Sequence, residues 1–256
     1  MPTADGRTLR LRWAAGRPCH GLWSRLPGAA TAGLLAGTGA DFVVLDLQHG
    51  ALGEADLPGV TAAVAAGGSV PLVRTRSAHL ADVGRALDLG AHGVIVPSVL
   101  GAEHAREVVA SCRYGPGGTR SIGRLSGGSD EPLVVLMVET AGALDELDAV
   151  LAVDGLDGVY VGPGDLSLGL GRPAADDRGH MREVVSGIVA RAVAAGIPVG
   201  VHAFSGTEAA GYAAEGATIV TAAMDTTSLG LVLAEELRLA RGERGDRPGE
   251  AATAPG

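Results

Sequence analysis

The stretch DFVVLDLQHG, residues 41–50, is apolar from Phe42 to Leu45 and then places Asp46, Gln48 and His49 within four positions. An unbroken run of valine and leucine is typical of a strand that is buried on both faces, as strands are in parallel sheets. The polar residues that follow it are either ordinary loop residues or part of a site. Which of the two applies depends on whether other strands of this chain end in the same way.

Similar apolar runs recur along the chain, and segments with helical spacing separate them, for example HLADVGRALDLG at 79–90. The runs cover residues 20–26, 41–47, 70–76, 93–99, 133–139, 158–164, 197–203 and 218–224. This alternation predicts parallel βαβ units, and that many units in 256 residues predict a (β/α)8 TIM barrel. An open doubly wound sheet is the alternative, but no glycine-rich dinucleotide turn follows the first run.

Composition limits the classes of protein that fit. The chain is 46% hydrophobic but only 3% aromatic, so its core is built from aliphatic residues. A net charge of −9 without a basic cluster argues against nucleic acid as a partner, and no apolar run is long enough to span a membrane. The first residues lack a signal-peptide pattern, and Cys19 and Cys112 match no metal spacing. We therefore expect a cytoplasmic protein with one barrel domain over residues 1–240 and a disordered tail over 241–256.

The absence of one residue type excludes several mechanisms. All 20 basic residues other than histidine are arginines, so the chain contains no lysine. A Schiff base with substrate or with pyridoxal phosphate is impossible, and so is a P-loop.

The carboxyl ends of the apolar runs carry polar residues at several further places. In a TIM barrel these ends converge on the active site. Taken singly, an arginine or histidine there is as well explained by a solvated or structural role, and an acid by helix capping. Together they suggest chemistry: two carboxylates suit Mg²⁺ or Mn²⁺, an arginine suits a substrate carboxylate, and a histidine suits proton transfer. The residues are Asp46, His49, Arg74, Ser98, Glu139 and Asp165.

Several motifs resemble the HpcH/HpaI aldolase family. They are DFVVLDLQHG, PLVRTR, ALDLGAHGVIVPSV, RYGPGGTRSIG and VDGLDGVYVGPGDLSLGLG, and the resemblance covers roughly residues 16–240 in order. It implies a (β/α)8 barrel and a pyruvate-specific class II aldolase that needs a divalent cation such as Mg²⁺, Mn²⁺ or Co²⁺. It also implies a homo-oligomer, a trimer or a hexamer, in which the last helix is exchanged between neighbours.

The resemblance assigns roles to individual residues. Glu139 and Asp165 match the metal ligands, and Arg74 matches the arginine that holds the pyruvate carboxylate. His49 matches the acid–base histidine. The other matches are Asp46 and Asp88, acids associated with that histidine, and Gly164, Trp23 and Ser98 on the substrate side, with Trp23 near the entrance.

The chain also departs from the family pattern. Gln48 stands where glutamate is common, and Met137 stands where the family often has glutamine. A thioether cannot replace an amide donor, so binding of the aldehyde is affected. The segment 121–132 is shorter than expected, and we expect it to be a mobile loop.

Three other functions fit parts of the sequence. Oxaloacetate decarboxylation would use the same pyruvate enolate. A phosphate-binding isomerase or synthase would need a glycine-rich anion site after the last two strands, where VHAFSGTEA and AAMDTTSLG offer one glycine each. A non-catalytic barrel would not need Glu139 and Asp165. In the favoured mechanism, the metal ion stabilises the enolate while His49, oriented by Asp46, moves the proton at the aldehyde oxygen.

Overall fold

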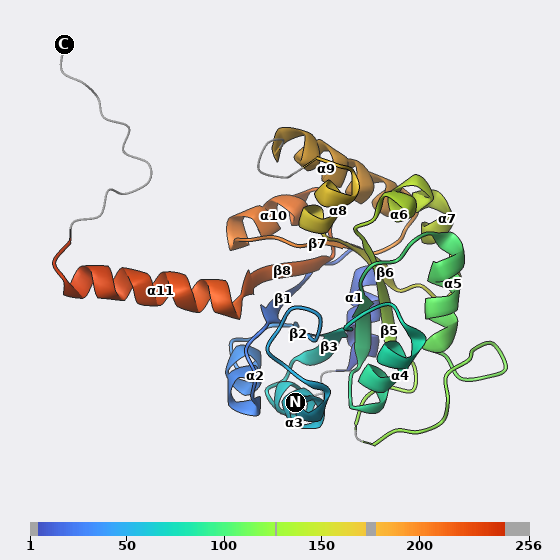
Figure 1. The fold of residues 1–256 in the computed structure, drawn as a ribbon, viewed down its shortest axis with the longest axis horizontal. Helices are drawn as coiled ribbons and strands as arrows, with labels where there is room; N and C mark the ends of the chain where they lie inside the picture. Colours follow the sequence, from blue (N-terminus) through green and yellow to red (C-terminus); the bar gives the residue numbers. More distant parts are fainter. Residues whose placement is uncertain (1–4, 126, 173–177, 244–256) are drawn as a thin grey trace, which may run out of the picture.

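A computed structural model describes residues 5–125, 127–172 and 178–243 of the protein. Within them, parallel strands close into a barrel in the order β1 to β8, and helices surround it (Figure 1). The predicted (β/α)8 TIM barrel is therefore confirmed, and the open sheet is excluded. Residues 244–256 of the tail, for which we expect disorder, lie outside the described residues.

The strands are short, and each neighbour along the chain is also the neighbour in the barrel. Because all of them run in the same direction, their carboxyl ends meet on one face. Their bounds are β1 Cys19–Ser24, β2 Phe42–Asp46, β3 Val70–Arg74, β4 Gly93–Val96, β5 Leu133–Val138, β6 Gly158–Val161, β7 Val199–Val201 and β8 Ile219–Met224.

A helix precedes the first strand, and at least one helix follows every strand. The helices are α1 Gly6–Ala14, α2 Ala29–Ala36, α3 Leu57–Ala66, α4 Leu80–Asp88, α5 Ala102–Ser111, α6 Ala141–Asp145, α7 Leu147–Leu151, α8 Pro163–Gly169, α9 Arg178–Ala194, α10 Gly206–Ala214 and α11 Asp225–Ala240, with a 3-10 turn at Glu54–Asp56. None of the helices in the described part of the chain is long and apolar enough to cross a membrane. Between 121 and 132, the described residues form no helix and no strand.

The interior of the barrel holds three large buried aromatic side chains of an aromatic-poor protein, namely Trp23, Phe42 and Tyr160. Glycines on neighbouring strands make room for them. A Cβ atom at Gly21 would lie 2.3 Å from the ring of Phe42, and one at Gly200 would lie 2.6 Å from the ring of Tyr160. Side chains any larger would therefore displace these rings, which fill the barrel below the carboxyl ends of the strands.

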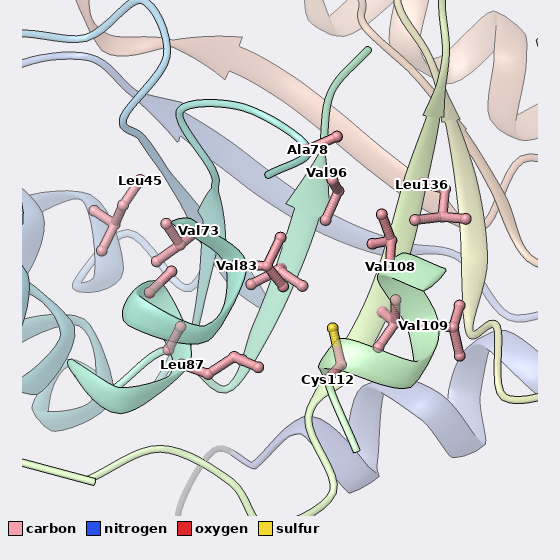
Figure 2. Packing of buried hydrophobic residues seen from close by; sticks show 14 of the residues in the cluster. Leu45, Val73, Ala78, Val83, Leu87, Val96, Val108, Val109, Cys112 and Leu136 are labelled. Carbon is pink, nitrogen blue, oxygen red and sulfur yellow. The ribbon is translucent and has the colours of Figure 1, made fainter. Parts of the chain in front are cut away.

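A second apolar layer joins the outside of the barrel to the helices. Valines of β3 and β4 and Leu136 of β5 face Val83 of α4 and Val108 of α5, and all of these side chains are buried (Figure 2). This layer holds the strands in place and therefore fixes the positions of the residues at their ends.

Helix α11 differs from the others because it extends away from the barrel (Figure 1). The apolar stripe that the sequence predicts in it, Leu229, Leu233 and Leu237, is between 50% and 56% exposed. The stripe therefore does not pack on its own barrel.

Candidate active site

The carboxyl ends of the strands surround a cleft of about 200 Å³. Its walls come from the ends of every strand except β4, and they bring His49, Arg74, Gly164 and Asp165 together as the sequence predicts. The residues that line it are Arg25, His49, Arg74, Met137, Gly162, Pro163, Gly164, Asp165, His202, Phe204 and Met224.

Asp46 and Arg74 form a buried, two-bonded pair at the bottom of this cleft. Nε of Arg74 donates to Oδ1 of Asp46 at 2.8 Å, and Nη2 donates to Oδ2 at 2.5 Å. Burial alone would raise the pKa of Asp46, but the hydrogen bonds and charge of Arg74 outweigh it and hold that pKa below its usual value. The pair is therefore ionised, with the guanidinium fixed at the edge of the cleft.

Asp46 also fixes the turn that carries His49. Its Oδ1 accepts the backbone N–H groups of Gln48 at 3.0 Å and His49 at 3.1 Å. On the other side, Nε of Arg25 donates to the backbone oxygen of His49 at 2.9 Å. Asp46 therefore orients His49 through the backbone and not through the imidazole, which is exposed toward the cleft.

Glu139 lies immediately behind Gly162 of the cleft wall, and it is only 4% exposed. Its Oε1 accepts the backbone N–H of Ser98 at 2.6 Å, and this N–H is presented by a residue in the left-handed region, with φ 56°. Its Oε2 is buried and has no hydrogen-bond partner among the residues that the structure describes. Burial, to which the charge of Asp165 adds, raises the pKa of Glu139 even though the Ser98 N–H lowers it.

These two carboxylates fit a hard divalent cation. A buried carboxylate oxygen without a partner is costly, and a bound cation would satisfy it. Gly162 leaves the space open, because a Cβ atom there would lie 2.7 Å from Oε2 of Glu139. In the described part of the chain no group of three His, Cys, Asp or Glu residues could hold a metal. The pair suits a cation such as Mg²⁺, which is commonly held by one or two carboxylates together with substrate and water.

Three predicted residues lie elsewhere than expected within this chain. Trp23 does not lie at an entrance: its side chain is 1% exposed, and Nε1 donates to Asp46 at 3.1 Å from below. Asp88 ends helix α4, which runs back from the cleft toward the opposite end of the barrel, and there Arg120 donates to it at 3.1 Å. Within one chain, therefore, Asp88 does not meet His49. Ser98 contributes its backbone N–H to Glu139 instead of lining the cleft.

Two titratable residues of the cleft, His202 and Arg25, were not identified from the sequence. His202 follows β7 directly and could have been found by the rule used for the other strand ends, since its strand was identified. Arg25 follows β1, and its backbone N–H donates to Asp225 at 3.0 Å, a contact across 200 positions that no local pattern reveals.

The sequence and the fold of this chain are similar to those of known proteins. A family model described as HpcH/HpaI aldolase/citrate lyase matches residues 20–230. A hydroxypyruvate/pyruvate aldolase of Rhizorhabdus wittichii is 37% identical over 86% of this chain and 93% of its own. A 4-hydroxy-2-oxo-heptane-1,7-dioate aldolase of Salmonella dublin is 32% identical over 84% of this chain and 87% of its own. A crystal structure of an HpcH/HpaI aldolase/citrate lyase family protein from Burkholderia cenocepacia has a TM-score of 0.85 at 26% identity, covering 91% of this chain and 99% of that one.

Proposed function

Because the chain belongs to the HpcH/HpaI aldolase/citrate lyase family and is a carbon–carbon lyase, we propose that it is a divalent-metal-dependent aldolase. It cleaves and forms 2-keto acids through the enolate of pyruvate and an aldehyde. The observation that carries this proposal is the unpartnered Oε2 of Glu139 beside Asp165, across the cleft from the guanidinium of Arg74.

Arg74 and the carboxylate pair have complementary tasks. A divalent cation held by Glu139 and Asp165 would act as a Lewis acid toward the keto oxygen of pyruvate. Arg74 binds the carboxylate of pyruvate, and its pairing with Asp46 fixes the guanidinium before substrate arrives. The position of the methyl group is then set, so that transfer of one of its protons to solvent water leaves the enolate in a defined orientation.

His49 transfers the proton to and from the aldehyde oxygen. In condensation, C3 of the enolate forms a bond to the aldehyde carbon, and the aldehyde oxygen takes a proton from the imidazole, directly or through water. In cleavage, the imidazole removes that hydroxyl proton while the same carbon–carbon bond breaks and its electrons return to the enolate. The exposed imidazole on a turn held by Asp46 and Arg25 suits both directions.

Proton exchange at C3 of pyruvate in D₂O, followed by NMR, tests the enolate half alone. Protein stripped with EDTA should show no exchange above the uncatalysed rate, and added Mn²⁺, Co²⁺ or Mg²⁺ should restore it. Asp165→Asn should reduce the restored rate, whereas Asp148→Asn, an exposed acid on α7 that pairs with Arg191, should behave as wild type. Exchange that continues in metal-free protein would refute the metal-dependent mechanism.

We further propose that the protein is a homo-oligomer, a trimer or hexamer, in which α11 packs on a neighbouring copy. The exposed leucines of a helix that leaves its own barrel support this assembly.

A further inference from the structure

The wall of the cleft formed after β7 contains a histidine to which no role has been assigned so far. The ring of His202 stands edge-on to Trp23, with centroids 5.0 Å apart, and edge-on to Phe204 at 5.4 Å. These aromatic contacts fix the orientation of the imidazole. Among the described residues, its ring nitrogens have no hydrogen-bond partner, so their capacity is available to a molecule in the cleft.

His202 is uncharged at neutral pH. Burial, together with the nearby charge of Arg74, lowers its pKa to about 4. A neutral imidazole offers one N–H donor and one acceptor nitrogen. A hydroxyl group also donates and accepts, so it can use both, whereas a carboxylate only accepts and can use the N–H alone.

The other walls have tasks in the proposed reaction. Arg74 on β3 faces the carboxylate of pyruvate, and Glu139 and Asp165 after β5 and β6 face its keto oxygen. His49 after β2 faces the aldehyde oxygen. The rest of the aldehyde therefore meets the wall after β7 and β8, which consists of His202, the exposed ring of Phe204 and Met224.

Among the described residues that line the cleft, the charges leave no cation for a second carboxylate. Two guanidinium groups lie beside Asp46, that of Arg74 and that of Arg25, whose Nε is 3.7 Å from Oδ2 of Asp46. The single negative charge of Asp46 balances one of these two positive charges. The carboxylate of pyruvate neutralises the other, and Glu139 and Asp165 balance a divalent cation. By contrast, the substrate named for the Salmonella dublin relative, a heptane-1,7-dioate, carries two carboxylates.

We propose that His202 is a specificity-determining residue that binds a hydroxyl group on a short, uncharged aldehyde. The inference rests on the proposed aldolase function. It makes hydroxyaldehydes better partners than alkyl aldehydes of the same size, and better than aldehydes that carry a carboxylate.

Glycolaldehyde and propionaldehyde form a matched pair, because a hydroxyl in one replaces a methyl in the other. The quantity to measure is the ratio of their kcat/KM values in condensation with pyruvate, compared between wild type and variants so that their different intrinsic reactivities cancel. His202→Leu should lower this ratio about tenfold, the worth of one hydrogen bond. His202→Asn, which keeps a donor and an acceptor, should restore part of it. His20→Leu, at an exposed position in β1, should leave the ratio at the wild-type value.

Both kcat/KM values of a ratio are measured on one preparation. A partial loss of folded protein lowers both values equally and does not change the ratio. Pyruvate proton exchange in the same samples separates the two proposals: wild type without exchange refutes the aldolase itself. Normal exchange with an unchanged ratio in His202→Leu refutes the role of His202 alone. A wild-type preference for succinic semialdehyde over glycolaldehyde would refute the requirement for an uncharged partner.

Discussion

Arg74 reaches the cleft with two of its nitrogens already engaged by Asp46. Lysine at this position would carry the charge but not the planar set of donors that can hold Asp46 and a substrate carboxylate together. We predict that Arg74→Lys loses about 1.5–3 kcal/mol of interaction with pyruvate, the usual worth of a hydrogen bond to a charged group. Steady-state kcat/KM for pyruvate measures this loss.

Arg76→Lys is the matched control, because Arg76 lies two residues further along, is exposed, and pairs with Glu54 outside the cleft. If Arg74→Lys and Arg76→Lys both keep the wild-type kcat and KM, Arg74 does not bind the substrate.

His49 separates the two halves of the mechanism. If Arg74 and the metal ligands suffice for the enolate, His49→Ala should keep bound metal and much of the pyruvate proton exchange. Aldol cleavage should fall by about 10²–10⁴-fold, the usual contribution of a general acid or base. Metal content, melting temperature and cleavage rate, measured on one preparation, test this expectation. A stable, metal-loaded variant with normal cleavage would leave the imidazole without a catalytic role.

His202 links the cleft to the pH dependence of stability. Its pKa of about 4 in the folded protein lies below the unfolded value of about 6.5, so the unfolded chain binds the extra proton first. The contribution of neutral His202 to the free energy of unfolding is therefore complete above about pH 6.5, and it is lost as the pH falls toward 4. Between pH 7 and 4.5, wild type should lose about 2 kcal/mol more unfolding free energy than His202→Asn. Urea unfolding at both pH values measures the difference, and equal losses in the two proteins would contradict it.

At the scale of elements, the sequence predicts which residues end each strand. It does not predict where a residue on a helix lies relative to the cleft. The apolar runs fixed which residues end a strand, and parallel strands bring those ends together, so His49, Arg74 and Asp165 meet as expected. The same rule covers His202, which was missed only because its strand was read for glycine. Asp88 was assigned by the resemblance and by no strand end; within one chain it lies at the end of α4, where Arg120 donates to it, away from His49.

Helix α11 contacts its own barrel near its first residue, but Leu229, Leu233 and Leu237 further along it are exposed in a single copy of the chain. Burying one leucine is worth about 1.5–3 kcal/mol, so several exposed leucines favour contact with another copy. We predict that Leu233→Glu combined with Leu237→Glu shifts the protein to smaller assemblies, as measured by light scattering at micromolar concentration. Leu34→Glu, on α2 and 75% exposed, is the control and should not change the assembly. A monomeric wild type would contradict the proposal.

At the scale of the whole molecule, a chain without lysine relies on oxygen ligands and arginine for carbanion chemistry. The barrel supplies both at one face, because Arg74 ends β3, Glu139 follows β5, and Asp165 lies in the helix that follows β6. Holding two carboxylates near each other, one of them buried, lowers the stability of the metal-free protein. If Glu139 and Asp165 hold the cation as proposed, the stability of the protein is coupled to metal binding.

This coupling predicts a metal-dependent melting temperature. A ligand present at 100 times its Kd stabilises the folded state by about 2.7 kcal/mol. For a chain of this size each kcal/mol raises Tm by about 2–4 °C, so saturating Mn²⁺ should raise Tm by about 5–10 °C over EDTA-treated protein. The protein concentration is held constant, because assembly also affects Tm. Glu139→Gln should raise the Tm of metal-free protein, since it removes a buried charge, and should abolish the shift with Mn²⁺. A full shift that persists in both Glu139→Gln and Asp165→Asn would place the metal elsewhere in the molecule.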